Sequence, residues 1–141
     1  MKFLLRNIYL LFIFLCYNSN ASVTNDTQIL EPVTWEFDTV KITDTEYELV
    51  FTANIDPKWS VYSQEIDGFG PIPTSFEFSE NLNIEFIDGV IEDYTNRVTE
   101  QDPVFDMVVS KFYTKAKFIQ KVKLKDKTSP VSGYLTFMTC D

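Results

Sequence analysis

Hydrophobic and polar residues alternate along most of this chain with a period of two, which is typical of β-strands that have one buried face. The clearest run is YELVFTANI, residues 47–55, whose apolar positions are Tyr47, Leu49, Phe51, Ala53 and Ile55. Shorter runs of the same kind occupy residues 33–37, 60–64, 76–78, 82–87 and 134–139. We therefore expect a chain of short strands.

Turn signals separate these runs. DPKW at 56–59, DGFGPIPTS at 67–75 and TSPVSG at 128–133 predict turns or loops, because Gly, Pro and Asp favour them. The dipeptide Asp88–Gly89 predicts a hairpin turn. A change in the parity of the apolar residues predicts a bulge or break near Thr39. Residues 93–107 are polar and irregular, which predicts a long loop.

Residues 111–127 predict one long strand with lysines on one face. The lysines are Lys115, Lys117, Lys121, Lys123, Lys125 and Lys127. This stripe has two interpretations: a surface on which a partner docks, or a solvated strand face that discourages edge-to-edge aggregation. With about seven to nine short strands and no convincing helix, the chain is expected to fold as an all-β antiparallel β-sandwich.

The amino terminus has the layout of a secretory signal peptide. Lys2 and Arg6 precede an apolar stretch of about ten residues, and SNA then offers a cleavage site after Ala21. The apolar stretch is shorter than the roughly 20 residues that a membrane-spanning helix needs. We therefore expect residues 1–21 to be a signal peptide, 22–32 a leader segment and 33–141 the folded domain.

Composition limits the partners and the kinds of catalysis that this chain can have. The net charge is −9, and it becomes −11 if residues 1–21 are removed, because Lys2 and Arg6 leave with them and no acid does. Such a chain repels nucleic acid phosphates. It has no histidine, which excludes Ser-His-Asp and Cys-His catalysis and most zinc sites. Cys16 falls in the predicted signal peptide, so Cys140 is the single cysteine of the mature chain and suggests a missing partner or a reactive thiol.

Four segments together, in this order and spacing, resemble a known family. They are YELVFTANIDPKWSVYSQ, GPIPTSFEF, DPVFDM followed by FYTKAKFIQKVKL, and GYLTFMTCD. Over about residues 33–141 they are similar to the amino-terminal domain of the thiol:disulfide interchange protein DsbD, in the form found in Bacteroidetes-like bacteria. The resemblance implies a periplasmic, immunoglobulin-like sandwich without cofactor or metal. It also implies that the domain takes electrons from a membrane-embedded reductase domain and passes them to thioredoxin-like proteins through mixed disulfides.

The resemblance also assigns roles to residues. It makes Cys140 the first of two redox cysteines, with the second expected several residues beyond Asp141. Because a second thiol must resolve a mixed disulfide, Cys140 alone is one half of a redox centre. By position, DPVFDM corresponds to a cap loop over the cysteines, in which Phe105 matches the shielding aromatic and Asp102 lies near it. Tyr62 and Trp59 match aromatics that pack close to the cysteine pair, with plain core packing as the alternative for both.

Two other functions stay open. The acidic, β-rich and histidine-free composition also suits an exported immunoglobulin-like module that binds a protein without redox activity. A hydrolase is the third possibility, because carboxylates are plentiful, although acids on solvated strands and in turns are the ordinary explanation. These carboxylates are Glu77, Glu85, Asp88, Glu92 and Asp93.

Overall fold

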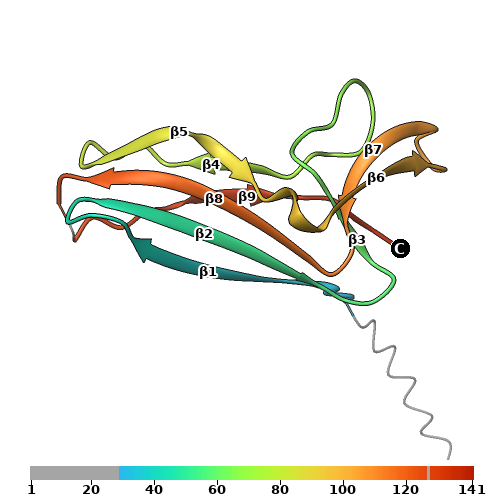
Figure 1. Cartoon of the computed structure of the whole chain (residues 1–141), viewed down its shortest axis with the longest axis horizontal. Coiled ribbons are helices and arrows are strands. Elements are labelled where there is room, and N and C mark those ends of the chain that lie inside the picture. The colour runs from blue at the N-terminus through green and yellow to red at the C-terminus, as the bar shows by residue number, and fades with distance from the viewer. Residues whose placement is uncertain (1–28, 127) are drawn as a thin grey trace, which may run out of the picture. The chain divides into compact units, whose positions relative to one another are not determined.

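A computed structural model describes residues 29–126 and 128–141, and the compact unit within it spans Glu31–Asp141 (Figure 1). The predicted signal peptide and the leader up to residue 28 lie outside the described residues. In the described part the elements are β1 (Val33–Lys41), β2 (Glu46–Ile55), β3 (Ser60–Tyr62), β4 (Ser75–Phe78), β5 (Ile84–Glu92), the 3₁₀ helix η1 (Tyr94–Asn96), β6 (Arg97–Asp102), β7 (Met107–Phe112), β8 (Lys115–Leu124), β9 (Gly133–Thr136) and β10 (Thr139–Cys140). None of the described residues belongs to a helix long and apolar enough to cross a membrane.

The strands form three antiparallel sheets. Their orders are β1-β2-β8-β5, β10-β3-β7-β6 and β4-β9. In Figure 1 the long strands β1, β2 and β8 run side by side, and β6 and β7 form a two-stranded ribbon that extends away from them at the upper right. The prediction of an all-β antiparallel sandwich is confirmed.

The core lies between the sheet β1-β2-β8-β5 and the other two sheets. Fully buried residues come from both sides of this core, for example Phe118 of β8 and Phe112 of β7. The centroids of these two rings are 6.0 Å apart. Phe76 of β4 lies 5.3 Å from Phe118 and 4.8 Å from Phe51. The alternating apolar positions thus supply a continuous aromatic core, which is how period-two strands become a stable two-layer fold.

Two expected interruptions of strands are wrong. No bulge breaks β1 near Thr39, since its register with β2 is continuous from Val33 to Lys41 and Val40 simply lies on the solvent-facing side. Asp88–Gly89 does not turn a hairpin. Asp88 has φ 55°, and the register shift between Ile87 and Ile91 makes this a β-bulge within β5, while both halves still pair with β8.

Other boundaries also differ from expectation. The predicted loop 93–107 contains η1 and the strand β6, whose polar residues are tolerated because it is the edge strand of its sheet. The predicted strand 111–127 is divided at Tyr113–Thr114 into β7 and β8, which belong to different sheets. The predicted final strand 134–139 is likewise divided into β9 and β10. This last division carries the chain across to β3 and places Cys140 there.

Four lysines of the stripe, Lys115, Lys117, Lys121 and Lys123, lie in β8 and alternate with its buried residues. Lys125 follows the strand, and Lys127 lies outside the described residues. Lys123 is directly opposite Glu46 on one neighbouring strand and Glu85 on the other, and Lys121 is opposite Glu48. Opposite charges across antiparallel strands attract each other at the surface. This arrangement accounts for the stripe as a solvated strand face with acidic residues on the neighbouring strands.

Candidate functional site

The candidate site lies on one face of the sheet β10-β3-β7-β6. Tyr62 of β3 is directly opposite Lys111 of β7, and Cys140 of β10 is opposite Ser60. Because alternate residues of a strand share a face, Ser60, Tyr62, Lys111 and Cys140 point to the same side. The residues between them, Val61 and Phe112, are buried in the core on the other side.

Asp102, the last residue of β6, is the centre of this site and is only 1% exposed. Its Oδ2 accepts a hydrogen bond from the Tyr62 hydroxyl at 2.8 Å. The same oxygen forms an ion pair with Lys111 Nζ at 2.7 Å. Its Oδ1 accepts the backbone N–H groups of Val104 at 2.8 Å and Phe105 at 3.1 Å. One carboxylate thus joins two strands to the loop that follows β6.

That loop, residues 103–106, covers the site with Phe105. The Phe105 and Tyr62 rings meet edge to face, with centroids 6.1 Å apart. The loop turns back sharply, since Asp106 has φ 52°, a left-handed conformation that Asp tolerates better than most residues. The two backbone bonds to Asp102 therefore hold Phe105 over Tyr62.

Lys111 and two further residues extend the network. Lys111 Nζ is 3.8 Å from Glu100 Oε1 and 5.0 Å from the centroid of the Tyr62 ring. The Tyr113 hydroxyl donates to Glu100 Oε1. The site therefore holds one buried cation between two carboxylates and two phenols.

The environment shifts the protonation equilibria of these groups. Burial raises the pKa of Tyr62 well above its ordinary value, and the hydrogen bond to Asp102 raises it further. Burial alone would raise the pKa of Asp102, but the bonds from Lys111, Phe105, Tyr62 and Val104 outweigh it and hold that pKa far below its ordinary value. Burial and the bond to Glu100 raise the pKa of Tyr113 to about 12. Near neutral pH the site therefore contains Asp102 as a carboxylate and both phenols protonated.

Cys140 borders this network. It is half-buried, and its backbone carbonyl accepts a hydrogen bond from Ser60 Oγ at 3.1 Å. Thr139 Oγ1 donates to the Ser60 carbonyl at 2.8 Å, so β10 is held to β3 by side chains as well as by the ladder. The Cys140 sulfur lies near enough to Tyr62 and Tyr113 to contribute to the raised pKa of both.

The structure brings together four of the five residues that the sequence singled out: Cys140, Tyr62, Asp102 and Phe105. The fifth, Trp59, is placed differently. It follows the turn after β2 and packs against the core cluster. Sequence reasoning missed Lys111, Glu100 and Tyr113. Lys111 has the same parity as the solvated lysines of β8, so period two alone predicts that it faces solvent.

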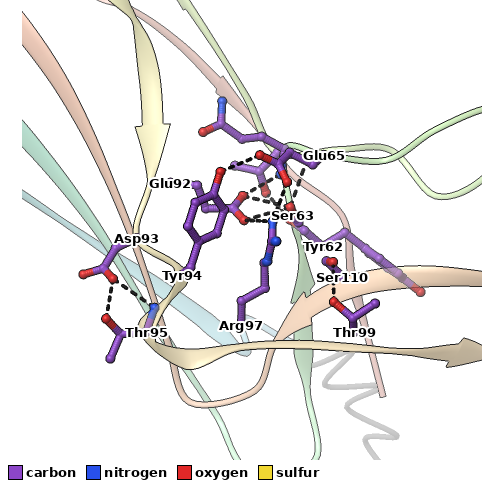
Figure 2. A network of polar contacts seen from close by, with 12 residues as sticks. Tyr62, Ser63, Glu65, Glu92, Asp93, Tyr94, Thr95, Arg97, Thr99 and Ser110 are labelled. Atoms are coloured by element: carbon purple, nitrogen blue, oxygen red, sulfur yellow. Dashed lines mark hydrogen bonds and ion pairs between the residues drawn. The ribbon is translucent and has the colours of Figure 1, made fainter.

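A second polar network adjoins the first where the chain leaves β3 (Figure 2). Glu92, whose side chain is 2% exposed, accepts from Ser63 Oγ at 2.8 Å and from the Gln64 backbone N–H at 2.8 Å. Arg97 lies 3.4 Å from Glu92 and 2.5 Å from Glu65. The Tyr94 hydroxyl donates to Glu65 at 2.6 Å, and the Arg97 guanidinium stacks 4.1 Å from the centre of the Tyr94 ring.

These contacts give the carboxylates structural roles. The hydrogen bond from Tyr94 and the pairing with Arg97 lower the pKa of Glu65. Asp93 accepts from Thr95 and caps η1, and the bond from the Thr95 hydroxyl lowers the pKa of Asp93. Glu92, which a hydrolase could have used, is thus engaged in holding the chain after β3 to Arg97 of β6, and Asp93 is engaged in capping η1.

Replacing Arg97 with leucine is expected to lower the free energy of unfolding by about 1–2 kcal/mol, because it leaves the buried Glu92 carboxylate with neutral donors only. Denaturation in urea measures the change. Lys41→Leu, at the exposed pair of Lys41 with Asp44, is the control and is expected to change the free energy of unfolding by less than about 0.5 kcal/mol. An equal loss in both variants would contradict the assignment.

Within residues 29–126 and 128–141, no three His, Cys, Asp or Glu side chains gather where they could hold a metal ion. No known family profile matches the chain, and no curated protein or solved structure matches it either.

Proposed function

We propose that this chain is a periplasmic thiol–disulfide exchange domain with an immunoglobulin-like fold. Cys140 is one half of its redox pair. The domain takes electrons from a membrane-embedded reductase and passes them to thioredoxin-like partner proteins.

One observation carries the proposal: Cys140, the one cysteine among the described residues, borders a buried polar network under a loop-borne aromatic. Cys140 shares a face of the sheet with Tyr62, Tyr62 is covered by Phe105, and the Phe105 loop is held by Asp102. A cysteine with a purely structural role needs no such surroundings. An aromatic on a short loop, by contrast, can shield a thiol from small oxidants and move aside when a partner docks.

The chemistry needs two thiols. The Cys140 thiolate attacks one sulfur of a partner's disulfide, so that a new S–S bond forms to Cys140 and the partner's second sulfur leaves as a thiolate. A second thiolate of this protein, which the resemblance places beyond Asp141, then attacks the Cys140 sulfur and releases the partner as a dithiol. The protein becomes oxidised by two electrons, and the membrane reductase returns them by the reverse reaction.

Trapping the first step tests the proposal. The chain carrying Cys16→Ser, in which Cys140 is the only thiol, is mixed with a thioredoxin-like protein that has a single active-site cysteine, activated with thionitrobenzoate. We expect release of one equivalent of thionitrobenzoate and a one-to-one covalent adduct that dithiothreitol reverses. Mass spectrometry and non-reducing gels measure the adduct.

The matched control adds Cys140→Ser, which is expected to abolish the adduct. If the Cys16→Ser chain reacts with free dithiobis(nitrobenzoate), the disulfide of thionitrobenzoate, but forms no adduct with the activated protein, the proposal fails. The chain is then better described as a binding module without redox activity.

A further inference from the structure

Lys111 is a buried lysine on the face of the sheet that also carries the candidate thiol. Its side chain is 8% exposed, and it lies in the part of β7, residues 109–112, in which every residue is buried. Lysines are almost never this buried unless they are paired, because removing the charge from water costs several kcal/mol. A lysine retained here therefore points to a need for positive charge at this place.

Lys111 is connected to the loop over the site through Asp102. Nζ pairs with Asp102 Oδ2 at 2.7 Å, while the other oxygen of the same carboxylate holds the loop at Val104 and Phe105. Lys111 thus keeps Asp102 ionised and fixed in orientation. A neutral or rotated Asp102 would hold the two backbone N–H groups less strongly, and Phe105 would cover Tyr62 less completely.

Lys111 also offsets the acids around Cys140. The charged and titratable groups on this face are Asp102 and Glu100 of β6, Tyr62 of β3 and Tyr113 after β7. Asp106 lies in the adjoining loop, and Asp141 follows Cys140 in the chain. All of these are acids or phenols. Lys111 is the cation that the described residues place among them.

We propose that Lys111 is a positioning residue for the reaction of Cys140. It holds the Phe105 loop closed through Asp102, and it supplies the positive charge that anionic reactants meet near the thiol. This inference rests on the proposed function, since it concerns the reactivity of the same cysteine.

Two alkylating reagents of similar size separate these effects. Iodoacetamide is neutral and reports access to the thiol, whereas iodoacetate is anionic and also reports the local charge. In the Cys16→Ser chain, we expect Lys111→Met to lower the ratio of the iodoacetate rate to the iodoacetamide rate by about three- to tenfold, because one positive charge is lost nearby. The iodoacetamide rate itself should rise several-fold as Phe105 loosens.

Two further variants keep the test decisive. Lys111→Arg is expected to keep the ratio within about twofold of the Cys16→Ser chain, because the charge is retained. If Lys111→Met does not fold, Lys111→Gln, whose neutral amide can still donate to Asp102, replaces it with the same expected fall in the ratio. The double variant of Lys111→Met with Asp102→Asn, which buries no unpaired charge, is the second comparison. The double variant loses one charge of each sign, so its ratio of iodoacetate to iodoacetamide rates should return to within about twofold of the Cys16→Ser chain. If Lys111 had a purely structural role, the double variant and Lys111→Met would have the same ratio.

An unchanged ratio in Lys111→Met would overturn the inference. The inference would also be overturned if the double variant had the same lowered ratio as Lys111→Met. Failure of the proposed function is a separate result, because it shows as a missing adduct with the activated partner protein, whereas the alkylation ratio is measured without any disulfide exchange.

Discussion

Replacing Asp102 with alanine is expected to lower the free energy of unfolding by about 3–5 kcal/mol, because it leaves the Lys111 ammonium buried without its partner. The same change removes the acceptor of the Tyr62 hydroxyl and of the Val104 and Phe105 backbone N–H groups. Urea denaturation followed by tryptophan fluorescence measures the loss. A loss below about 1 kcal/mol would show that Lys111 readily reaches solvent when Asp102 is gone.

Asp67→Ala provides the matched control. Asp67 is an exposed aspartate in the loop that follows β3, and its replacement is expected to change the free energy of unfolding by less than about 0.5 kcal/mol. The double variant Asp102→Asn with Lys111→Met removes both buried charges. It should recover part of the stability that Asp102→Ala loses, since an unpaired buried charge costs more than an absent pair.

The contribution of Asp102 also has a predictable pH dependence. Its pKa is lower in the folded protein than its ordinary value of 3.8, so the unfolded chain binds a proton there more readily than the folded one. The stabilisation is therefore complete above about pH 5 and is lost as the pH falls through 4 and below. The difference in free energy of unfolding between wild type and Asp102→Asn should shrink steadily from pH 5 to pH 2. A constant difference over this range would contradict the depressed pKa.

Replacing Gly133 with alanine is expected to cost about 2–3 kcal/mol, because the added Cβ would lie 2.2 Å from the backbone oxygen of Glu77 and 3.0 Å from the Cα of Phe78. These are backbone atoms of β4, so no side chain can turn away to make room. The change should weaken the pairing of β4 with β9, the strand that leads the chain to Cys140. Thermal unfolding measures the effect.

Gly89 offers the matched control, because a Cβ added there meets nothing within 4 Å. Gly89→Ala should leave the unfolding temperature within a degree or two of wild type, since it adds no contact and slightly restrains the unfolded chain. If both variants unfold at the same temperature, the close approach of β9 to β4 does not limit stability.

The strands themselves follow from the sequence. Period-two alternation is a local property, so YELVFTANI could be read as a strand without knowing its neighbours, and β2 begins one residue before that run. Errors occurred where a local signal had two outcomes. Asp-Gly can turn a hairpin or bulge a strand, and the choice at Asp88 depends on β8, which pairs with both halves of β5. Likewise the division at Tyr113–Thr114 reflects a change of sheet, which alternation within one segment does not report.

For the candidate site, too, the sequence predicted some features and not others. Cys140 stood out from composition, whereas Tyr62, Asp102 and Phe105 were expected only through the family resemblance. The contacts among these four residues were not expected. The separation of Ser60 and Cys140 by 80 positions shows why: their pairing is decided by backbone hydrogen bonds between distant segments. Trp59 is three residues from Tyr62 yet packs into the core, because the odd positions around β3 face the opposite side of the sheet.

The sequence by itself determined that this chain is a set of short antiparallel strands with one cysteine in its last strand, because alternation and composition are written residue by residue. Only the tertiary structure decided that Lys111 is buried while the lysines of β8 face water. Both kinds of lysine have the same local pattern. The difference arises because Asp102, the carboxylate that pairs with Lys111, is itself buried, so burial of the charge is tolerable. The glutamates opposite the β8 lysines are not buried.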